Sequence, residues 1–255
     1  MLDNLIIPSV DARIGALEEY NRQRRVLGQN HVARKKRRPC ITLSREFGCE
    51  GYPVAEKLCS LLAGQTGDRW LLVDREILDE VARRHQISQE VLQNLGEKNQ
   101  FLAEVIATFS PRWRTDRDYF RLLCEHVVSM AEQGNVIILE LGGACIARHL
   151  EDAHHIRLYA SRQFKVRSIA TRLELPEEEA EQLIDREQRQ RDQFLRTFLG
   201  QDGHDPGLYD LMINNTNHAP QKIAQTIASF VLAGDEGHQQ RKHSRPAEAA
   251  NASGP

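Results

Sequence analysis

The chain has 255 residues and is 40% hydrophobic, which is enough to bury a substantial core as one α/β domain with insertions or extensions. Its 34 basic and 36 acidic residues give a net charge of −2, so no global field favours a nucleic acid or an anionic membrane as the partner. The five cysteines are scattered, without C-x-x-C pairing or metal-like spacing with histidine, as is typical of the reducing cytoplasm. We expect neither an export signal nor a membrane anchor, because no segment approaches the roughly 18 apolar residues of a membrane span.

The first 39 residues are expected to be an extension (residues 1–39) that precedes the main domain (residues 40–233). A helical pattern over residues 12–26 is followed by the basic run RKKRRP, whose charges begin at Arg34 and end at Arg38. Because the run lacks interleaved aromatic residues, it is interpreted as a solvated linker in preference to a nucleic-acid contact. The extension is also a candidate contact for a protein partner.

Residues 41–58, ITLSREFGCEGYPVAEKL, have the order of a strand, a glycine-bearing turn and a helix. Gly48 and Gly51 permit a tight turn, and Pro53 suits the first position of a helix. This order directs several backbone N–H groups and the positive end of the helix dipole at one spot, where an anion can bind. The P-loop pattern G-x-x-x-x-G-K-[ST] is incomplete, since its lysine and hydroxyl are not in place. The turn alone therefore fits a plain strand-to-helix connection as well as a nucleotide site.

Further apolar runs, with helical patterns between them, are expected to be strands at residues 70–73, 136–139, 155–159 and 210–213. Strands that alternate with helices predict a parallel sheet with helices on its faces. In such sheets the ligand crevice lies at the carboxyl ends of the strands. The residues that directly follow each run are therefore the candidates for a site.

Charged residues follow two of these runs. Asp74 and Arg75 come directly after the second run, although a helix N-cap and a solvent-exposed charge fit them equally well. Glu140 closes the third run and resembles the magnesium-holding acid of P-loop enzymes, with an ordinary loop residue as the alternative. Cys49 stands at a helix N-terminus, which lowers a thiol pKa, yet a small loop residue is favoured over a nucleophile.

Helical patterns over residues 163–173 and 177–198 carry several arginines. These arginines can close over phosphates, because guanidinium forks match phosphate oxygens, or they can form i,i+4 surface pairs. Residues 85–130 are mostly helical in pattern and are interpreted as an acceptor-binding insertion or as packing. A final helix is expected over residues 221–232, and the tail at 234–255 is expected to be disordered because it lacks apolar residues.

Four blocks in order resemble the cytidylate kinase-like proteins, a divergent branch of the P-loop nucleoside monophosphate kinases: ITLSREFGCEG, LLVDREIL, YASRQFKVRSIATRLELPEEEAEQLI and GQDGHDPGLYDLMINNT. The resemblance runs from about residue 41 to residue 227. It implies a P-loop NTPase-type α/β fold with a five-stranded parallel sheet, a helical acceptor-binding insertion (about 85–130) and a lid (about 162–200). It also implies phosphoryl transfer from ATP, with Mg²⁺, to a nucleoside monophosphate or related small acceptor. The alternative is a non-catalytic nucleotide-binding regulator with a degraded loop.

The matched blocks also imply roles for single residues. The implied phosphate- and nucleotide-binding residues are Ser44, Glu46, Gly48, Cys49, Gly51, Asn214 and Thr216. The implied catalytic cations are Arg45, Lys165, Arg172 and Arg191. To these the strand ends add Asp74 and Arg75 as acceptor-binding residues and Glu140 as the magnesium ligand.

The chain departs from the family pattern at several of these positions. Within the turn, Cys49 and Glu50 replace Ser and Gly, and a carboxylate there repels phosphate unless it points away or holds a cation. After the third run, Glu140 and Leu141 replace the usual Gly-Arg, so an arginine expected near the acceptor is missing. In the lid, Gln188 and Gln193 stand where an acid and a second arginine are usual.

Overall fold

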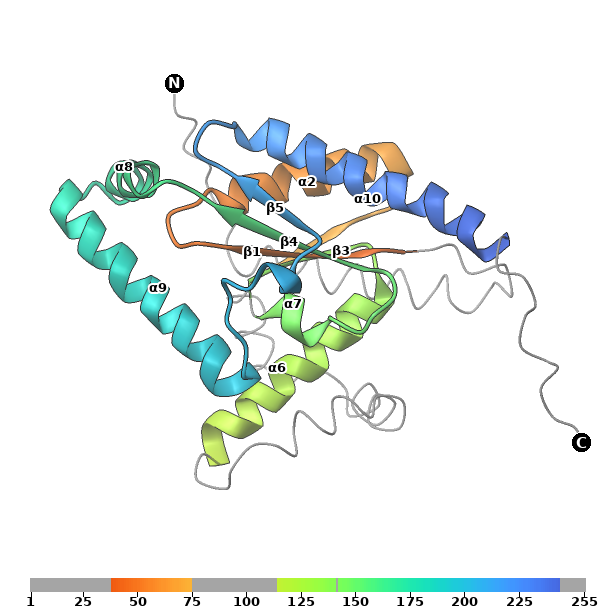
Figure 1. The fold of residues 1–255 in the computed structure, drawn as a ribbon, viewed down its shortest axis with the longest axis horizontal. Helices are drawn as coiled ribbons and strands as arrows, with labels where there is room; N and C mark the ends of the chain where they lie inside the picture. The colour runs from red at the N-terminus through yellow and green to blue at the C-terminus, as the bar shows by residue number, and fades with distance from the viewer. Residues whose placement is uncertain (1–37, 75–113, 141, 244–255) are drawn as a thin grey trace, which may run out of the picture.

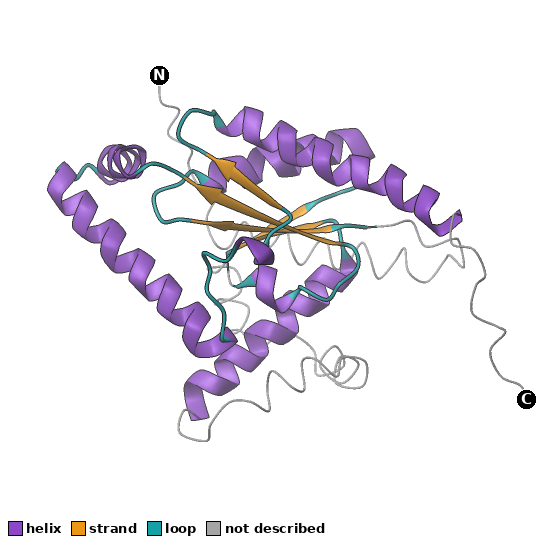
Figure 2. Cartoon of the chain, in the orientation of Figure 1, coloured by secondary structure: helices purple, strands orange, loops and turns teal. Residues whose placement is uncertain are grey.

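The computed structural model describes residues 38–74, 114–140 and 142–243. Its centre is a five-stranded sheet with the strand order β2-β3-β1-β4-β5, in which every neighbouring pair is parallel. The strands are β1 (Cys40–Arg45), β2 (Leu71–Val73), β3 (Val136–Leu139), β4 (Ala153–Tyr159) and β5 (Leu211–Asn214). The predicted helix-flanked parallel sheet is thereby confirmed (Figure 2).

Helices cover both faces of the sheet (Figure 1). One face carries α2 (Gly51–Thr66) and α10 (Pro220–His243), and the other carries α6 (Arg114–Gln133) and the short α7 (Gly143–Ile146). A pair of helices, α8 (Arg162–Leu173) and α9 (Glu177–Leu199), stands beyond the carboxyl ends of the strands, followed by the 3₁₀ turn η1 (Pro206–Leu208). The α8–α9 pair occupies the segment predicted to be the lid.

Side chains that alternate along the strands pack into two separate hydrophobic cores, one on each face of the sheet. Ile41 and Leu43 of β1 pack with Ile137 of β3 in the core under α2 and α10. Cys40 and Ile138 point to the opposite core, which α6 and α7 cover. Because β3 and most of β1 are buried on both faces of the sheet, they are largely continuous apolar runs, whereas the edge strand β5 alternates between partly buried and exposed residues. The apolar runs are what made β1 and β3 recognisable in the sequence.

The observed elements differ from the predicted ones mainly at their ends. β1 continues to Arg45 because that residue still pairs with Leu158 of β4. α10 continues to His243, past the predicted end at residue 232 and into the predicted tail. The polar stretch at its end contains Glu, Gln, Arg and Lys, which are good helix formers. The N-terminal extension up to residue 37, most of the predicted insertion (residues 85–113), Arg75 and residues 244–255 lie outside the described residues.

Within the described part of the chain, none of the helices combines the length and the apolar character that crossing a membrane requires.

Two buried histidines make stability depend on pH. Burial lowers the pKa of His126 on α6 to about 4. It also lowers the pKa of His155 on β4, against an opposing effect of Asp210, and the His155 ring shares a hydrogen bond of 2.8 Å with the Thr42 hydroxyl. Both imidazoles therefore stay neutral in the folded chain at pH values where the unfolded chain is protonated.

We expect the free energy of unfolding to fall as the pH drops below about 6.5, the unperturbed histidine pKa. The unfolded chain then takes up protons that the folded chain does not bind, until the pH reaches the folded pKa. His126→Gln should reduce the slope by up to about 1.4 kcal/mol per pH unit between pH 6.5 and 5, measured by urea unfolding. His218→Gln, at an exposed position, is the control. Equal slopes for the unsubstituted chain and His126→Gln would contradict this expectation.

Candidate functional site

The loop between β1 and α2 requires glycine at two positions. Gly48 has a φ of +99°, and a Cβ there would lie 2.7 Å from the Cβ of Lys165, so α8 packs directly on the loop. A Cβ at Gly51 would collide with the Cδ of Arg45. The Arg45 side chain therefore lies across the start of α2, where a phosphate-binding turn directs its amides.

Several amides of this loop already have acceptors. The Phe47 N–H donates to the Gln188 Oε1 atom of α9 at 2.9 Å, and the Glu50 N–H donates to the Asn215 Oδ1 atom at 2.8 Å. Among the residues that the structure describes, the amides of Gly48 and Gly51 have no acceptor. The loop thus has the conformation of an anion cradle, with part of its donor set satisfied by side chains from the lid and from the turn after β5.

The Glu50 carboxylate points away from the cavity. Its Oε2 atom accepts a hydrogen bond from the Asn215 Nδ2 atom at 3.2 Å, and Asn215 is completely buried. Glu50 does not line the cavity described below. The repulsion expected from a carboxylate in the turn is therefore avoided, because this side chain anchors the loop to the turn after β5.

A charged cluster lies beside the loop, where β1 and β3 end. The Oε1 atom of Glu140 lies 3.2 Å from Arg45 Nε and 3.0 Å from Arg191 Nη1. The φ of Glu140 is +71°, a conformation that non-glycine residues seldom adopt. Burial lowers the pKa of Arg45, and the nearby Glu140 carboxylate partly offsets this. Arg45 Nε and Glu140 Oε1 have no hydrogen-bond partner within the described residues, so their contact is an ion pair by distance only.

Further contacts fix the two arginines to the loop. Arg45 donates from Nη1 to the carbonyl of Cys49 at 3.0 Å. Arg191 donates from Nη1 to the carbonyl of Arg45 at 3.4 Å, and its guanidinium lies 5.1 Å from the centre of the Phe47 ring. The lid helix α9 is therefore held against the loop by charge, by a cation–π contact and by the Gln188 hydrogen bond.

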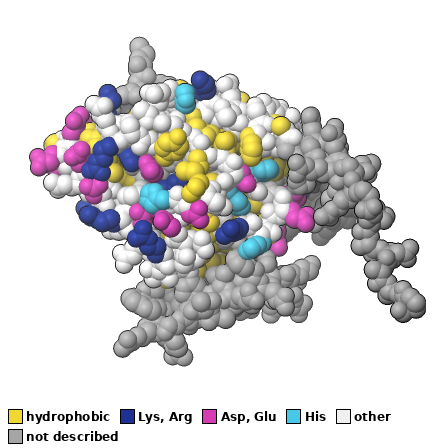
Figure 3. All heavy atoms as spheres, in the orientation of Figure 1, with side chains coloured by type: hydrophobic (Ala, Val, Ile, Leu, Met, Phe, Trp, Pro, Cys, Tyr) yellow, Lys and Arg dark blue, Asp and Glu magenta, His cyan; other side chains and the backbone are white. Residues whose placement is uncertain are grey.

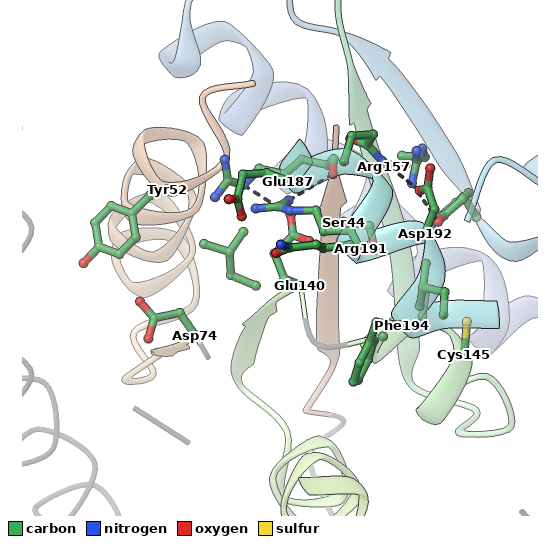
Figure 4. Close-up of a pocket in the computed structure, with 18 of the residues that line it drawn as sticks. Ser44, Tyr52, Asp74, Glu140, Cys145, Arg157, Glu187, Arg191, Asp192 and Phe194 are labelled. Carbon is green, nitrogen blue, oxygen red and sulfur yellow. Dashed lines mark hydrogen bonds and ion pairs between the residues drawn. The ribbon is translucent and has the colours of Figure 1, made fainter. Parts of the chain in front are cut away.

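A cavity of about 330 Å³ opens at this cluster, within the size range of small-molecule sites. Its walls come from the ends of β1 and β3, from α7 and from the facing side of α9. Figure 4 shows Tyr52 and Asp74 at one end, Arg157 and Cys145 toward the other, and Ser44, Glu140 and Arg191 between them. The cavity as a whole is lined by four arginines and four carboxylates. Three of the arginines, Arg45, Arg172 and Arg191, gather around Glu140, so an anionic group is favoured at this part of the cavity.

The lid arginines divide into two sets. Arg172 and Arg191 line the cavity. Others form surface pairs, since Arg162 pairs with Asp185 and Arg186 with Glu187. Figure 3 shows charged side chains of both signs gathered over α8 and α9. Surface pairing therefore describes part of these helices, and phosphate contact by Arg172 and Arg191 stays a prediction.

Other predicted residues lie around the loop without lining the cavity. Lys165 Nζ lies 2.8 Å from Glu46 Oε2, an ion pair that ties α8 to the loop. Thr216 accepts a hydrogen bond at Oγ1 from the Ser161 N–H at 2.8 Å, and Asn214 accepts one from the Thr216 N–H at 2.9 Å. The turn after β5 thus contacts the start of the lid, at the sheet edge opposite to β2 and Asp74.

The structure therefore brings together in one cavity Ser44, Arg45, Asp74, Glu140, Arg172 and Arg191. Cavity residues that the sequence did not single out include Arg157 on β4 and Tyr209 before β5. The signal for Arg157 was present, since an arginine interrupts the otherwise apolar end of the fourth predicted strand, HIRLY. An isolated charge inside a buried strand calls for a partner or a ligand.

Comparison with known proteins identifies a family. The family described as the cytidylate kinase-like family matches residues 40–217. A cytidylate kinase of Sulfurisphaera tokodaii is 28% identical over 158 residues, covering 61% of this chain and 77% of that protein. A cytidylate kinase of Sulfolobus acidocaldarius is 30% identical over 156 residues, covering 61% and 76%.

A solved structure of an uncharacterized protein from Eubacterium ventriosum shares the fold. It has a TM-score of 0.59 at 17% identity and covers 77% of this chain and 99% of that chain. The family match spans more than half of the chain, and its blocks contain both the loop and the lid residues that meet at the cavity. The chain therefore belongs to the cytidylate kinase-like family.

Proposed function

We propose that the protein transfers a phosphoryl group from ATP to a nucleoside monophosphate or a related small acceptor. The observation that carries this proposal is the convergence of Arg45, Arg172 and Arg191 on one cavity beside a glycine loop and a helix N-terminus. Phosphoryl transfer needs positioning and charge stabilisation more than covalent chemistry. The five cysteines are all free, which suits the cytoplasm as the proposed location.

In this proposal the donor phosphates lie against the loop amides of Gly48 and Gly51, at the start of α2. Guanidinium groups of Arg45 and Arg191 neutralise the charge that spreads over the phosphate oxygens during transfer. The acceptor enters from the end of the cavity where Asp74 lies. The turn that contains Asn214 and Thr216 is assigned to the neighbourhood of the donor base.

The lid must move before the loop can take phosphates fully. Gln188 accepts the Phe47 N–H, and Arg191 lies on the Phe47 ring, so both contacts occupy the loop in the described arrangement. A phosphate offers stronger, charge-assisted acceptors to the same amide. Exchange of Gln188 for a phosphate oxygen is the step by which binding would reposition α9.

Mg²⁺ is expected to accompany the donor phosphates and to reduce their charge. Glu140 as its ligand stays a prediction. In the described arrangement the Glu140 Oε1 atom faces two guanidinium groups, and a cation at that oxygen would have to displace at least one of them. This donor set fits a counter-ion better than a metal ligand, so we assign to Glu140 the neutralisation of Arg45 and Arg191 while phosphate is absent.

A non-catalytic nucleotide-binding regulator is the second candidate. It is favoured by the satisfied amides of Phe47 and Glu50 and by the ion pairs that already occupy Arg45 and Arg191. Such a protein would bind a nucleotide and rearrange its lid without turnover. The two candidates share the site and differ in whether ATP is consumed.

Turnover separates these candidates. ATP consumption by the full chain with Mg²⁺ and a panel of nucleoside monophosphates should exceed the buffer rate for at least one acceptor. Arg191→Ala should lower kcat/KM by about 100-fold or more, because it removes a charge that stabilises the transition state. Arg189→Ala is the matched control, an exposed arginine of the same helix outside the cavity, and it should leave kcat/KM unchanged. The absence of ATP consumption with every acceptor would contradict the proposed activity.

The assignment of Glu140 has its own test. Glu140→Gln should tighten ATP binding about 3- to 10-fold in calorimetry, because phosphate then no longer competes with a carboxylate for the two arginines. Glu187→Gln is the control, since that cavity carboxylate pairs with Arg186 rather than with the cluster. A loss of affinity in Glu140→Gln that appears only with Mg²⁺ would instead identify Glu140 as a metal ligand.

A further inference from the structure

Arg157 is a charged residue inside the sheet. It lies on β4, in register with Ser44 of β1 on one side and Met212 of β5 on the other. Only 4% of its surface is exposed, yet it lines the cavity. A buried guanidinium costs several kcal/mol unless a counter-ion and hydrogen bonds compensate it. Its partners therefore decide what it does.

The partners of Arg157 within the described residues include no carboxylate in direct contact with its guanidinium. Its Nη1 atom donates to the Tyr209 Oη atom at 3.1 Å, and its guanidinium lies 5.4 Å from the centre of the Tyr209 ring. The Nη2 atom is buried and has no hydrogen-bond partner in the described part of the chain, and no carboxylate described there forms an ion pair with Arg157.

Tyr209 does not supply the missing negative charge. Burial raises the pKa of its phenol, although Arg157 and a hydrogen bond with Ser44 act in the opposite direction. The phenol donates its proton to the carbonyl of Gly203 at 2.8 Å, which requires the neutral form. Asp202 feels the charge of Arg157 but is exposed and accepts a hydrogen bond from the backbone of His204.

The neighbouring acids are occupied elsewhere. Asp192 of α9 accepts from Gln188 Nε2 at 2.8 Å and lies 3.5 Å from His204 Nε2. Glu140 is engaged by Arg45 and Arg191 on the far side of Ser44, since β1 separates β3 from β4. Figure 4 shows Arg157 at the end of the cavity away from Asp74. Arg157 therefore lines a cavity of ligand size. Its Nη2 atom is sealed from solvent and has no hydrogen-bond partner among the described residues, and neither Asp192 nor Asp202 forms an ion pair with it.

We propose that Arg157 forms a subsite for an oxyanion group of the acceptor, either a carboxylate or a phosphate, at the part of the cavity that Ser44 also lines. The buried Nη2 atom supplies the charged donor, and Tyr209 holds the guanidinium in place. Only the assignment of this oxyanion to the acceptor rests on the proposed function. The subsite selects anionic acceptors against neutral nucleosides, because a neutral ligand leaves the Arg157 charge uncompensated.

The test is a titration of inorganic phosphate, and separately of acetate, into the full chain with ¹³C,¹⁵N-labelled arginine, without ATP. The signals of Arg157, identified by their loss in Arg157→Met, should shift along a saturable curve for at least one of the two anions. The stronger anion identifies the group as a phosphate or a carboxylate. In Arg45→Ala, the apparent Kd for the anion, measured from the Arg157 shift, should stay within about threefold of the value for the unsubstituted chain. The reason is that this substitution affects the loop and not the Arg157 subsite.

Several outcomes would overturn the proposal: an Arg157 signal that neither anion moves, or a shift that disappears in Arg45→Ala. If Arg157→Met does not fold, crystals of the unsubstituted chain grown with phosphate and with acetate provide the test. The absence of a bound anion at Arg157 Nη2 in both crystal structures would overturn the proposal. Because no step requires ATP, anion binding at Arg157 can be found in a protein without turnover. Conversely, turnover without anion binding at Arg157 would reject the subsite alone.

Discussion

The attraction between the Glu140 carboxylate and the guanidinium groups of Arg45 and Arg191 connects the three parts of the site. Arg45 belongs to the end of β1, Glu140 follows β3, and Arg191 lies on the lid helix α9. A single partly buried carboxylate therefore couples the sheet to the lid, and it stands where a bound phosphate would also attract both arginines. Ion pairs in such surroundings are screened less than surface pairs. In the proposed function, competition between Glu140 and phosphate for the two arginines would therefore control whether α9 stays on the loop.

Three departures from the family pattern, in the turn, in the lid and after β3, have physical roles in the structure. Glu50 faces Asn215 and anchors the loop to the turn after β5. Gln188 takes an amide of the loop as a neutral acceptor. Glu140 supplies the carboxylate that pairs with Arg45 and Arg191. In the proposed function, phosphate would replace the contacts of Gln188 and Glu140, whereas the Glu50–Asn215 contact would stay in place.

Much of the fold was predictable because the central strands are buried on both faces and therefore form apolar runs. The five-stranded parallel sheet and the lid segment followed from the resemblance, whereas no pattern in the sequence predicted the strand order. The residues that the resemblance named include most of the charged cluster. The pairing of Glu50 with Asn215 joins residues 165 positions apart, and no local pattern in the sequence reports such a contact. Arg157 was overlooked for a related reason: an arginine in a strand signals a site only once its partners are known. The continuation of α10 to His243 likewise depends on helix propensity in a stretch without apolar residues.

The central claim is that this cavity binds nucleotide phosphates. Thermal unfolding of the full chain with ATP and Mg²⁺, beside a panel of nucleoside monophosphates, tests it most directly. A ligand at 100 times its Kd should add roughly 2.7 kcal/mol to the free energy of unfolding and raise the melting temperature by several degrees. A saturable rise with ATP that is lost in Arg45→Ala is the predicted result. A melting temperature that no nucleotide changes, up to millimolar concentration, would contradict the account.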